Sequence, residues 1–474
     1  MTYAHYIAGE WVTDDAVSIN INPSNIDDIV GEFSRGDAAR VDEAVAAANA
    51  AQPDWAAASP QLRHDVLEKA SNLITSRKDE LGRLLSREEG KTLAEGIGET
   101  MRAAQVFKFF AGEAIRNVGD AVASIRPGID VTVEREAVGT IGLITPWNFP
   151  IAIPAWKLAP ALAYGNAVVM KPAELTPGCA WELAKILHEA GCPAGVFNLV
   201  MGPGSTVGAR IVEHPGIDAI SFTGSVATGN TIAVQCASTG KRVQMEMGGK
   251  NPLVVVDDAD LDVAVATAIN GAFFSTGQRC TASSRLIVTA GIHDAFLEKL
   301  TSAAANLIVG DALDAATQIG PVVDQKQLDQ NLRYLKLASD EGCDVRGGEL
   351  ANGPGFFMKP AIFAGATNQM TVSREEIFGP MASVIKVADY DEALAVANDT
   401  EFGLSAGICT TSLRYASDFR KKAQAGMVMV NLPTAGVDYH VPFGGRKGSS
   451  YGPREQGSYA REFYTIVKTS YIAP

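Results

Sequence analysis

Apolar residues recur at every third or fourth position through most of the first quarter of the chain. After a short start, the stretch 37–52 and the stretch of about 60–115 are rich in Ala and Leu with few helix breakers, which predicts helices in both. From residue 121 the period changes to two, and Val131 and Val133 alternate with polar residues. Such alternation is typical of an exposed or edge hairpin, so residues 121–138 are predicted to form one.

From about residue 139, a short apolar run, a turn and a helical stretch repeat in series. The apolar runs with strand character are 138–144, 166–171, 195–200 and 218–222. The helical stretches begin near 154, at 176 (ending near 190), near 205 and near 228. Alternation at this spacing predicts a parallel sheet wrapped by helices.

A second series of the same kind starts at residues 251–258 and continues past 430. We therefore place a boundary near 247 and expect a second α/β domain that extends to about 446. The tail, residues 462–473, has strand character and leaves no room for a helix. We expect it to pair with something outside its own sheet.

The composition narrows the class of protein. The 474-residue chain is 47% apolar and has a net charge of −14, which predicts a soluble globular protein of two or three domains. An acidic chain is a poor partner for nucleic acid or an anionic membrane, so small-molecule chemistry is the default. The longest uncharged stretch, 138–156, contains Pro146, Pro150 and Pro154, which predicts a buried strand and loop rather than a membrane span.

The spacing of the cysteines indicates whether a metal site is expected, and the amino terminus indicates the cellular compartment. The six cysteines never fall within four residues of one another, and the six histidines are equally scattered, so no metal site is predicted. No basic segment followed by an apolar one opens the chain, so no secretion signal is expected. We expect free thiols in a reducing compartment, the cytoplasm, and most of the cysteines should be buried and inert.

Cys280 is the exception because its neighbours are polar. Gly277 allows a tight turn, and Gln278 and Arg279 precede the cysteine. Arg279 would help to hold Cys280 as a thiolate, and a helix that starts here would add its amide dipoles. The alternative is a structural cysteine in a polar turn.

Two further residues have the character of catalytic groups. Glu246 lies between two methionines at the end of a predicted strand, and apolar neighbours raise the pKa of a carboxyl group, which suits a general base. The alternative is a strand-end glutamate paired with Lys250. Asn148 lies in the proline-bounded loop 145–150, where its side-chain amide would be a fixed donor, although as structure alone it is an Asx turn.

These groups together predict a reaction. No histidine lies close to Cys280 in the sequence, and the nearest is His293. This disfavours a peptidase, which must deliver a proton to a leaving amine. Oxidation of an aldehyde needs only nucleophilic attack followed by departure of a hydride. Cys280 would form a thiohemiacetal whose oxyanion is held by Asn148 and the Cys280 amide. Nicotinamide would take the hydride, and Glu246 would activate water against the resulting thioester.

Six motifs occur in an order and at spacings that resemble the aldehyde dehydrogenase superfamily over essentially the whole chain. They are TPWNFP (145–150), KPAELTP (171–177), FTGS (222–225), MEMGGKNP (245–252), GQRC (277–280) and EEIFGP (375–380). The resemblance implies an α/β fold with two doubly wound open-sheet domains and a β-hairpin oligomerisation region. It assigns 1–118 and 139–247 to an NAD-binding domain, 248–446 to a catalytic, thiol-bearing domain, and 119–138 with 447–474 to the oligomerisation or bridging region. It also implies a homodimer or homotetramer.

The same resemblance assigns roles to particular residues. It makes Cys280 the nucleophile, Glu246 the general base, Asn148 the oxyanion donor and Glu455 a second acid or base. It implies cofactor contacts for Pro146, Trp147, Lys171, Glu174, Gly224, Ser225, Glu376 and Phe378. The glycines of 202–208 are spaced one residue too far for the dinucleotide fingerprint. Glu174 would accept hydrogen bonds from the ribose hydroxyls and repel a 2′-phosphate, so NAD is favoured, with NADP left open.

The candidate substrate-binding residues are Arg279, Phe149, Trp156, Tyr439, His440 and Phe443. As a cation beside the nucleophile, Arg279 would hold a carboxylate, sulfonate or phosphate at the far end of a short aldehyde; alternatively it turns outward. The stretches 147–166, 275–285 and 431–457 resemble bacterial 2-oxoglutarate-semialdehyde (2,5-dioxopentanoate) dehydrogenases. Succinate semialdehyde and sulfo- or hydroxy-aldehydes stay open as substrates.

Two other classes compete with this interpretation. A CoA-acylating semialdehyde dehydrogenase would share the fold and the thiolate, but it needs no base to activate water, so Glu246 argues against it. A non-catalytic binding or structural protein on the same scaffold is disfavoured by the intact set of Cys280, Glu246 and Asn148.

Overall fold

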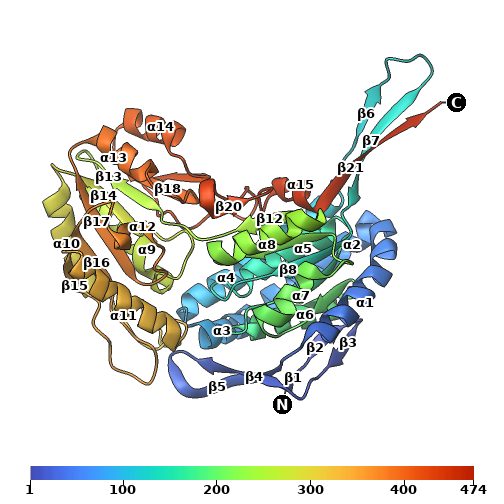
Figure 1. Ribbon diagram of the computed structural model, residues 1–474, viewed down its shortest axis with the longest axis horizontal. Coiled ribbons are helices and arrows are strands. Elements are labelled where there is room, and N and C mark those ends of the chain that lie inside the picture. Colours follow the sequence, from blue (N-terminus) through green and yellow to red (C-terminus); the bar gives the residue numbers. More distant parts are fainter. Residues whose placement is uncertain (1, 474) are drawn as a thin grey trace.

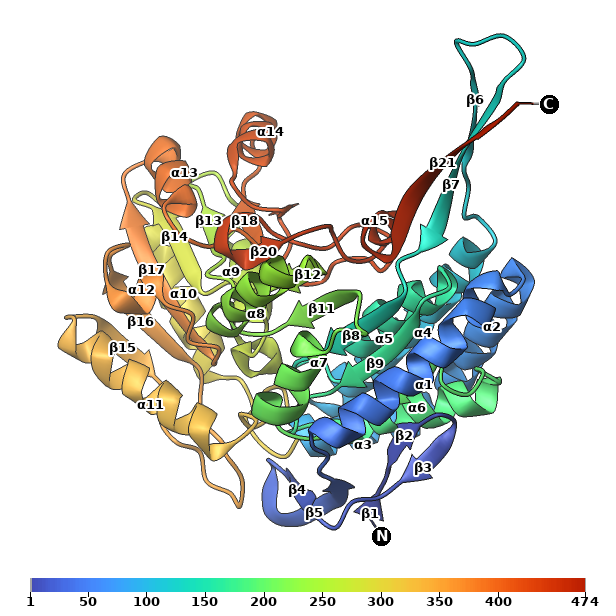
Figure 2. The same cartoon turned by 45° about the vertical axis from the view of Figure 1, so that its right-hand side comes forward.

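The computed structural model describes residues 2–473. Two large sheets lie side by side, each with helices packed on it, and a narrow ribbon of strands projects from the body (Figure 1). Figure 2 shows the same arrangement after rotation, with a small amino-terminal sheet at the edge of the body opposite the ribbon.

The first large sheet has eight strands in the order β20-β12-β11-β8-β9-β10-β2-β3. Its five central strands run parallel, which confirms the predicted parallel sheet, and the outer strands pair antiparallel. The bounds are β20 (Ser450–Tyr451), β12 (Arg242–Glu246), β11 (Ala219–Thr223), β8 (Thr140–Ile144), β9 (Ala167–Lys171), β10 (Phe197–Leu199), β2 (His5–Ile7) and β3 (Glu10–Val12).

Helices bury both faces of this sheet. One face packs on α2 (Pro60–Ser76), α3 (Lys78–Glu89), α4 (Leu93–Ala114), α5 (Ala152–Ala163) and α6 (Pro177–Ala190). The other packs on α1 (Ala38–Ala57), α7 (Ala209–Glu213) and α8 (Val226–Thr239), and a π-helical turn (Gly204–Gly208) precedes α7. Along β9, Val168 and Met170 enter the first core whereas Val169 enters the second. Burial on both faces is why these strands appear in the sequence as unbroken apolar runs.

The second large sheet has seven strands in the order β15-β16-β17-β14-β13-β18-β19, all parallel except β15. The strands are β15 (Asp344–Gly347), β16 (Ala361–Ala366), β17 (Met381–Val387), β14 (Arg285–Thr289), β13 (Pro252–Val255), β18 (Ser405–Cys409) and β19 (Met427–Val430). One face packs on α9 (Leu261–Phe273) and α10 (His293–Ala305). The other packs on α11 (Gln325–Asp340), α12 (Thr371–Arg374), α13 (Tyr390–Asn398) and α14 (Leu413–Lys422).

The projecting ribbon contains the predicted hairpin, β6 (Asp120–Ala123) and β7 (Asp130–Ala137), together with the tail strand β21 (Thr465–Ile472) (Figure 1). β21 runs antiparallel to β7, from Thr465 opposite Ala137 to Ile472 opposite Asp130. The expectation that the tail leaves no room for a helix is wrong, because a short helix, α15 (Arg461–Tyr464), precedes the strand. Its Phe463 and Tyr464 are buried in the first core, and that burial fixes the turn.

The first 34 residues contain more structure than the sequence pattern indicates. Besides β2 and β3, they form a small sheet of β1 (Thr2–Tyr3), β5 (Asn25–Ser34) and β4 (Val17–Asn22). Within residues 2–473, no helix combines the length and the apolar character needed to cross a membrane. Nor do the described residues include a group of three or more His, Cys, Asp or Glu side chains arranged to hold a metal ion.

Candidate active site

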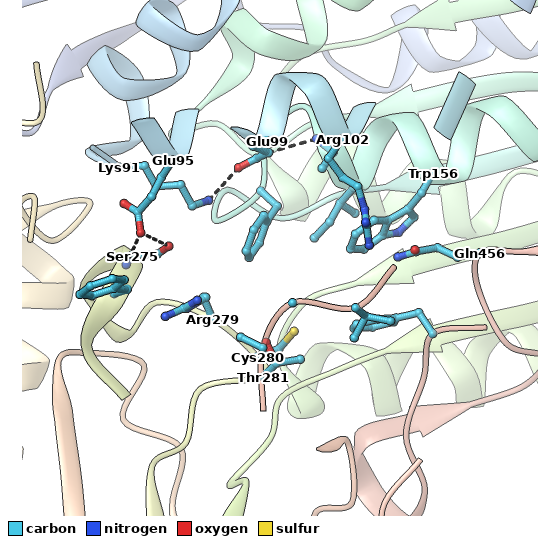
Figure 3. A pocket seen from close by; sticks show the side chains of 18 of the residues that line it. Lys91, Glu95, Glu99, Arg102, Trp156, Ser275, Arg279, Cys280, Thr281 and Gln456 are labelled. Atoms are coloured by element: carbon cyan, nitrogen blue, oxygen red, sulfur yellow. Dashed lines mark hydrogen bonds and ion pairs between the residues drawn. The ribbon is translucent and has the colours of Figure 1, made fainter. Parts of the chain in front are cut away.

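A cavity of about 400 Å³ lies between helices α4 and α5 on one side and the segment 270–281 on the other (Figure 3). The loop 435–443 contributes a further part of the wall. Most of the wall is apolar, and its large side chains are Phe149, Ile153, Trp156, Phe274, Val437 and Phe443. Cys280 lines the cavity on the side of the segment 270–281, so a single thiol faces an apolar space of the size of a small molecule.

The turn that carries Cys280 is held rigidly on both sides. A 3-10 turn (Phe274–Gly277) precedes it, and Ser275, Thr276 and Gly277 all adopt positive φ angles of 51°, 56° and 64°. Both the amide and the hydroxyl of Ser275 donate to Glu95 Oε1, at 2.8 and 2.9 Å. No helix starts at Cys280, so the expected contribution of helix amide dipoles is wrong.

The charge around Cys280 also differs from the expectation. Burial raises the pKa of the Cys280 thiol, and the nearby carboxylates of Glu376 and Glu246 raise it further. The Arg279 guanidinium donates to the carbonyl of Asn270 and extends away from Cys280 (Figure 3). Arg279 therefore does not hold the thiol as a thiolate, and Cys280 needs a proton acceptor when it reacts.

Glu246 is the last residue of β12, where it is buried and only 2% exposed. Burial raises the pKa of its carboxyl group, in the direction that the flanking methionines predict, and the neighbouring Glu455 raises it further. The Ser450 hydroxyl donates to Glu246 Oε2 at 2.6 Å. Lys250 makes no ion pair with Glu246 among the described residues, so the structural alternative for Glu246 is not what the chain adopts.

Glu455 lies next to this carboxylate in a buried polar network. Lys157, from α5, forms an ion pair with Glu455 and donates to the Ser221 hydroxyl at 2.8 Å. The amide and carbonyl of Glu455 pair with those of Phe443, which lines the cavity. The buried cation therefore pairs with Glu455, and within residues 2–473 the Ser450 hydroxyl is the hydrogen-bond partner of the Glu246 side chain.

Asn148 is buried in the loop between β8 and α5. Its side-chain amide donates to the carbonyl of Gln278 at 3.0 Å, which connects the loop to the turn of Cys280. Two residues that the sequence analysis missed hold the loop: Lys91 donates to the Asn148 carbonyl, and Glu99 accepts from the amides of Ile151 and Ala152 at 3.2 and 3.1 Å. Lys91 and Glu99 also pair with each other at 2.8 Å.

The expected adenosine side of the cofactor site has a matching hollow. A second cavity, of about 560 Å³, lies between α7 and α8 and is lined by Ile144, Val212, Phe222 and Ile232 among others. Lys171 is buried close by, and its burial lowers the pKa of the ammonium group to about 8, while Glu174 is exposed beside it. Ser225 caps α8 by accepting from the amide of Thr228, and Gly224 precedes it. An apolar slot, a cation and a helix start fit a dinucleotide.

The expected nicotinamide side lies near Cys280. Glu376 Oε1 accepts from the amide of Gly249 at 2.8 Å, and burial raises the pKa of Glu376 to about 7. Phe378, with a positive φ of 62°, packs edge-on against Trp147 with ring centroids 5.4 Å apart. Pro146 follows β8 in the same loop as Trp147. The structure therefore brings together residues that lie more than 200 positions apart in the sequence.

The predicted substrate residues divide into two groups. Phe149, Trp156, Arg279 and Phe443 line the cavity, and the rings of Trp156 and Phe443 lie 5.4 Å apart. Tyr439 and His440 do not line it, because Tyr439 packs against Phe109 at 6.2 Å and His440 is exposed. The charged or polar lining residues that the sequence analysis missed are Lys91, Glu95, Glu99, Arg102, Asn270, Ser275, Thr281 and Gln456. For Lys91, Glu95, Glu99 and Arg102, only their position in the predicted helical stretch of about 60–115 could have indicated them.

Comparison with known proteins identifies the class of this one. Residues 11–470 match the profile described as the aldehyde dehydrogenase family. The chain is 43% identical to the alpha-ketoglutaric semialdehyde dehydrogenase of Bacillus subtilis (strain 168), over 100% of this chain and 98% of that protein. It is 40% identical to the betaine aldehyde dehydrogenase of Rhizobium leguminosarum bv. trifolii (strain WSM2304), over 99% and 97%.

A solved structure agrees with these sequence matches. The NAD+ complex of an aldehyde dehydrogenase from Bacillus cereus superimposes with a TM-score of 0.97 at 34% identity, covering 100% of this chain and 97% of that one. The chain belongs to the aldehyde dehydrogenase family and is an oxidoreductase that acts on aldehydes. Its relatives at similar identity carry names with different aldehydes.

Proposed function

We propose that this protein oxidises a short aldehyde with a distal carboxylate, such as 2-oxoglutarate semialdehyde, to the carboxylic acid, with NAD as the preferred acceptor. The observation that supports the proposal is that Cys280 lines an apolar cavity, while Asn148 donates to the carbonyl of the nearby Gln278 and Glu246 lies close enough to shift the pKa of the Cys280 thiol. The name of the 43% identical relative supports the choice of substrate. Succinate semialdehyde and sulfo- or hydroxy-aldehydes are the alternatives within the same class.

Cys280 acts first. Its sulfur attacks the aldehyde carbon, and because burial raises the pKa of the thiol, a base must take the proton. Glu246, with its raised pKa, fits that task. The oxygen of the aldehyde becomes an oxyanion, which the Cys280 amide and the Asn148 side chain stabilise. Asn148 has a second N–H for this purpose, since only one is needed for the Gln278 carbonyl.

NAD, when bound, would supply the acceptor for the hydride lost from the thiohemiacetal carbon. Once Glu246 has passed the proton of the thiol to solvent, it removes a proton from the water that hydrolyses the thioester on Cys280, and this second proton goes to the departing sulfur. Glu455 lies next to Glu246 and pairs with Lys157, so it serves as a second acid or base for that proton. The result is a carboxylic acid and a free Cys280 thiol.

The chain's own residues would hold the cofactor at two ends. Lys171 and Glu174 would contact the adenosine ribose, and Gly224 and Ser225, at the start of α8, would lie by the pyrophosphate. Glu376 would contact the nicotinamide ribose, with Phe378, Trp147 and Pro146 beside it.

We assign residues 1–118 and 139–247 to NAD binding, 248–446 to the thiol-bearing domain, and 119–138 with 447–474 to assembly. The ribbon of β6, β7 and β21 exposes Val122, Ile125, Val467 and Tyr471, which supports a homodimer or homotetramer. The six free cysteines support a reducing, cytoplasmic location.

The test is a rate measurement over a panel of aldehydes with the full chain. The panel comprises 2-oxoglutarate semialdehyde, succinate semialdehyde, betaine aldehyde and pentanal, each with NAD, and with and without CoA. We expect the carboxylated aldehydes to give the highest kcat/KM and the product to be the free acid. A CoA thioester as product would support an acylating dehydrogenase instead.

Cys280→Ser and Cys343→Ser are the matched variants in this test. Cys280→Ser should lose at least about 10⁴-fold in rate, as removal of a nucleophile does. Cys343 is buried beside Met370 and does not line the cavity, so Cys343→Ser should retain the activity. Activity in Cys280→Ser, or no oxidation of any aldehyde by the native protein, would contradict the proposal.

A further inference from the structure

We propose that Arg102, on α4, is the cation that binds the distal carboxylate of the substrate, in place of Arg279. The inference rests on the proposed function, because it concerns the same cavity and the same class of aldehyde. It assigns substrate recognition to a residue that lies 178 positions before the nucleophile, 280 − 102 = 178.

Charge compensation separates the cations that line the cavity. They are Lys91, Arg102 and Arg279, and the carboxylates in the wall are Glu95 and Glu99. Lys91 pairs with Glu99 at 2.8 Å and also donates to a backbone carbonyl. This cation is neutralised within the wall and is held in place by the loop that it supports.

Arg279 forms no ion pair among residues 2–473, and its Nε is buried without a hydrogen-bond partner, but its guanidinium is tied to the backbone. It donates to the carbonyl of Asn270, and the charge of Glu95 lies near enough to favour its protonated form. Figure 3 shows its guanidinium extending away from Cys280, towards Ser275. A carboxylate bound there would have to displace a backbone contact and approach Glu95, which costs free energy.

Arg102 has no such partner. Among residues 2–473, its guanidinium makes neither a hydrogen bond nor an ion pair, and its recorded contact is with the ring of Tyr439, 5.8 Å from the centroid. The carboxylate with the largest effect on it, Asp438, is exposed and lies outside the cavity wall. A partly desolvated guanidinium that stays charged favours an anion able to accept two hydrogen bonds.

The direction of the side chain fits this role. In Figure 3, Arg102 extends from α4 into the cavity beside Trp156, whereas Cys280 lies on the opposite side. An aldehyde that reaches the sulfur with one end therefore presents its other end to α4. The apolar side chains between them, Phe149 and Trp156, suit a short chain of methylene groups. The same charge repels a trimethylammonium group, so betaine aldehyde should be a poor substrate.

The experiment compares Arg102→Gln and Arg102→Lys with Lys108→Gln, using 2-oxoglutarate semialdehyde and pentanal. Lys108 is an exposed cation on the same helix that does not line the cavity, so its variant controls for the loss of a positive charge. Arg102→Gln should lower kcat/KM for the semialdehyde by about 100-fold, chiefly through KM, and for pentanal by less than about threefold. The kcat/KM of Arg102→Lys for the semialdehyde should lie between those of the native protein and Arg102→Gln, because lysine keeps the positive charge but cannot donate two parallel hydrogen bonds to a carboxylate. Lys108→Gln should match the native protein.

The outcomes separate the inference from the proposed function. If the native protein prefers the semialdehyde and Arg102→Gln keeps that preference, Arg102 is not the anchor while the proposed function stands. Equal losses on both aldehydes would also overturn the inference, since they would indicate a general effect on folding or chemistry. If the native protein does not distinguish the semialdehyde from pentanal, the proposed substrate class fails and the anchor with it. Oxidation of pentanal by each variant reports that the variant is folded.

Discussion

Two buried clusters beside the cavity have the same composition and different surroundings. The loop cluster consists of Glu89, Lys91 and Glu99, and the strand-end cluster consists of Lys157, Glu246 and Glu455. Each contains one lysine and two carboxylates, and in each the lysine pairs most closely with one of them: Lys91 lies 2.8 Å from Glu99 and 3.7 Å from Glu89, and Lys157 pairs with Glu455. In each, burial raises the pKa of the remaining carboxylate, that of Glu89 to about 8 and that of Glu246 well above its usual range.

The clusters differ in what else they touch. In the loop cluster, Lys91 and Glu99 bind the backbone of residues 148–152, and Glu89 accepts from the amide of Lys91 at 2.9 Å. In the strand-end cluster, Glu246 accepts a hydroxyl group and lies close enough to Cys280 to shift the pKa of its thiol. A raised pKa therefore indicates burial, and only the position next to the thiol distinguishes a candidate base.

The largest effect within this comparison is expected for Glu246→Gln against Glu89→Gln. Without a base, hydrolysis of the thioester slows, so Glu246→Gln should lower kcat by about 100-fold or more. At a pH high enough for the Cys280 thiol to ionise without Glu246, a burst of one NADH per active site should precede the slow phase. Glu89→Gln, which neutralises another buried carboxylate whose pKa is also raised, should give no burst. Rapid-mixing absorbance at the NADH band measures both.

The pH dependence gives an independent check on Glu246. The carboxyl group is a base only when ionised, so kcat of the native protein should fall as the pH drops through its raised pKa. Glu246→Gln should remove that acid limb from the profile, and Glu89→Gln should keep it. If the limb survives in Glu246→Gln, another group accepts the proton.

An intermediate effect is expected for the loop cluster. Lys91→Met leaves Glu99 and Glu89 buried without a cation, which costs roughly 3–5 kcal/mol of folding stability. It also frees the loop of Asn148, so kcat should fall by about tenfold while KM changes little. The double variant Lys91→Met/Glu99→Gln removes both charges and should recover part of the melting temperature without recovering kcat. Full activity in the double variant would mean that the loop of Asn148 keeps its conformation without Lys91 and Glu99.

The two clusters also differ in how far the sequence predicts them. Glu246 and Cys280 were identified because each lies in a short motif whose neighbours already indicate its chemistry. Glu99 and Lys157 lie in helices, and Lys91 lies in the short loop between α3 and α4, within a stretch whose period predicts only helix. Their partners include residues up to 298 positions away, as for Lys157 and Glu455. Such contacts depend on tertiary packing, which a pattern of apolar residues does not encode.

The same limit explains the errors in the fold and at Arg279. The central strands were predicted because both faces are buried, whereas β2 and β3 have three residues each and pair at an antiparallel edge, so no period is long enough to detect. The direction of Arg279 follows from three successive positive φ angles at residues 275–277, of which only Gly277 is a glycine. Two of these angles belong to residues whose type gives no sign of them.

The smallest effect is expected at Glu174, an exposed carboxylate that contrasts with both buried clusters. Solvent screens the charge of this carboxylate. Lys171 lies close by, and burial lowers the pKa of its ammonium group to about 8. A direct contact with the ribose hydroxyls and repulsion of a 2′-phosphate should still favour NAD over NADP by at least tenfold, or about 1.4 kcal/mol. Glu174→Gln should reduce the preference to about threefold, chiefly by lowering KM for NADP, because the amide keeps an acceptor and loses the charge.

The matched control is Glu189→Gln, which replaces an exposed carboxylate at the far end of α6 and should keep the native ratio. Comparable kcat/KM with both cofactors in the native protein would show that the charge of Glu174 is too well solvated, or too mobile, to act on the phosphate.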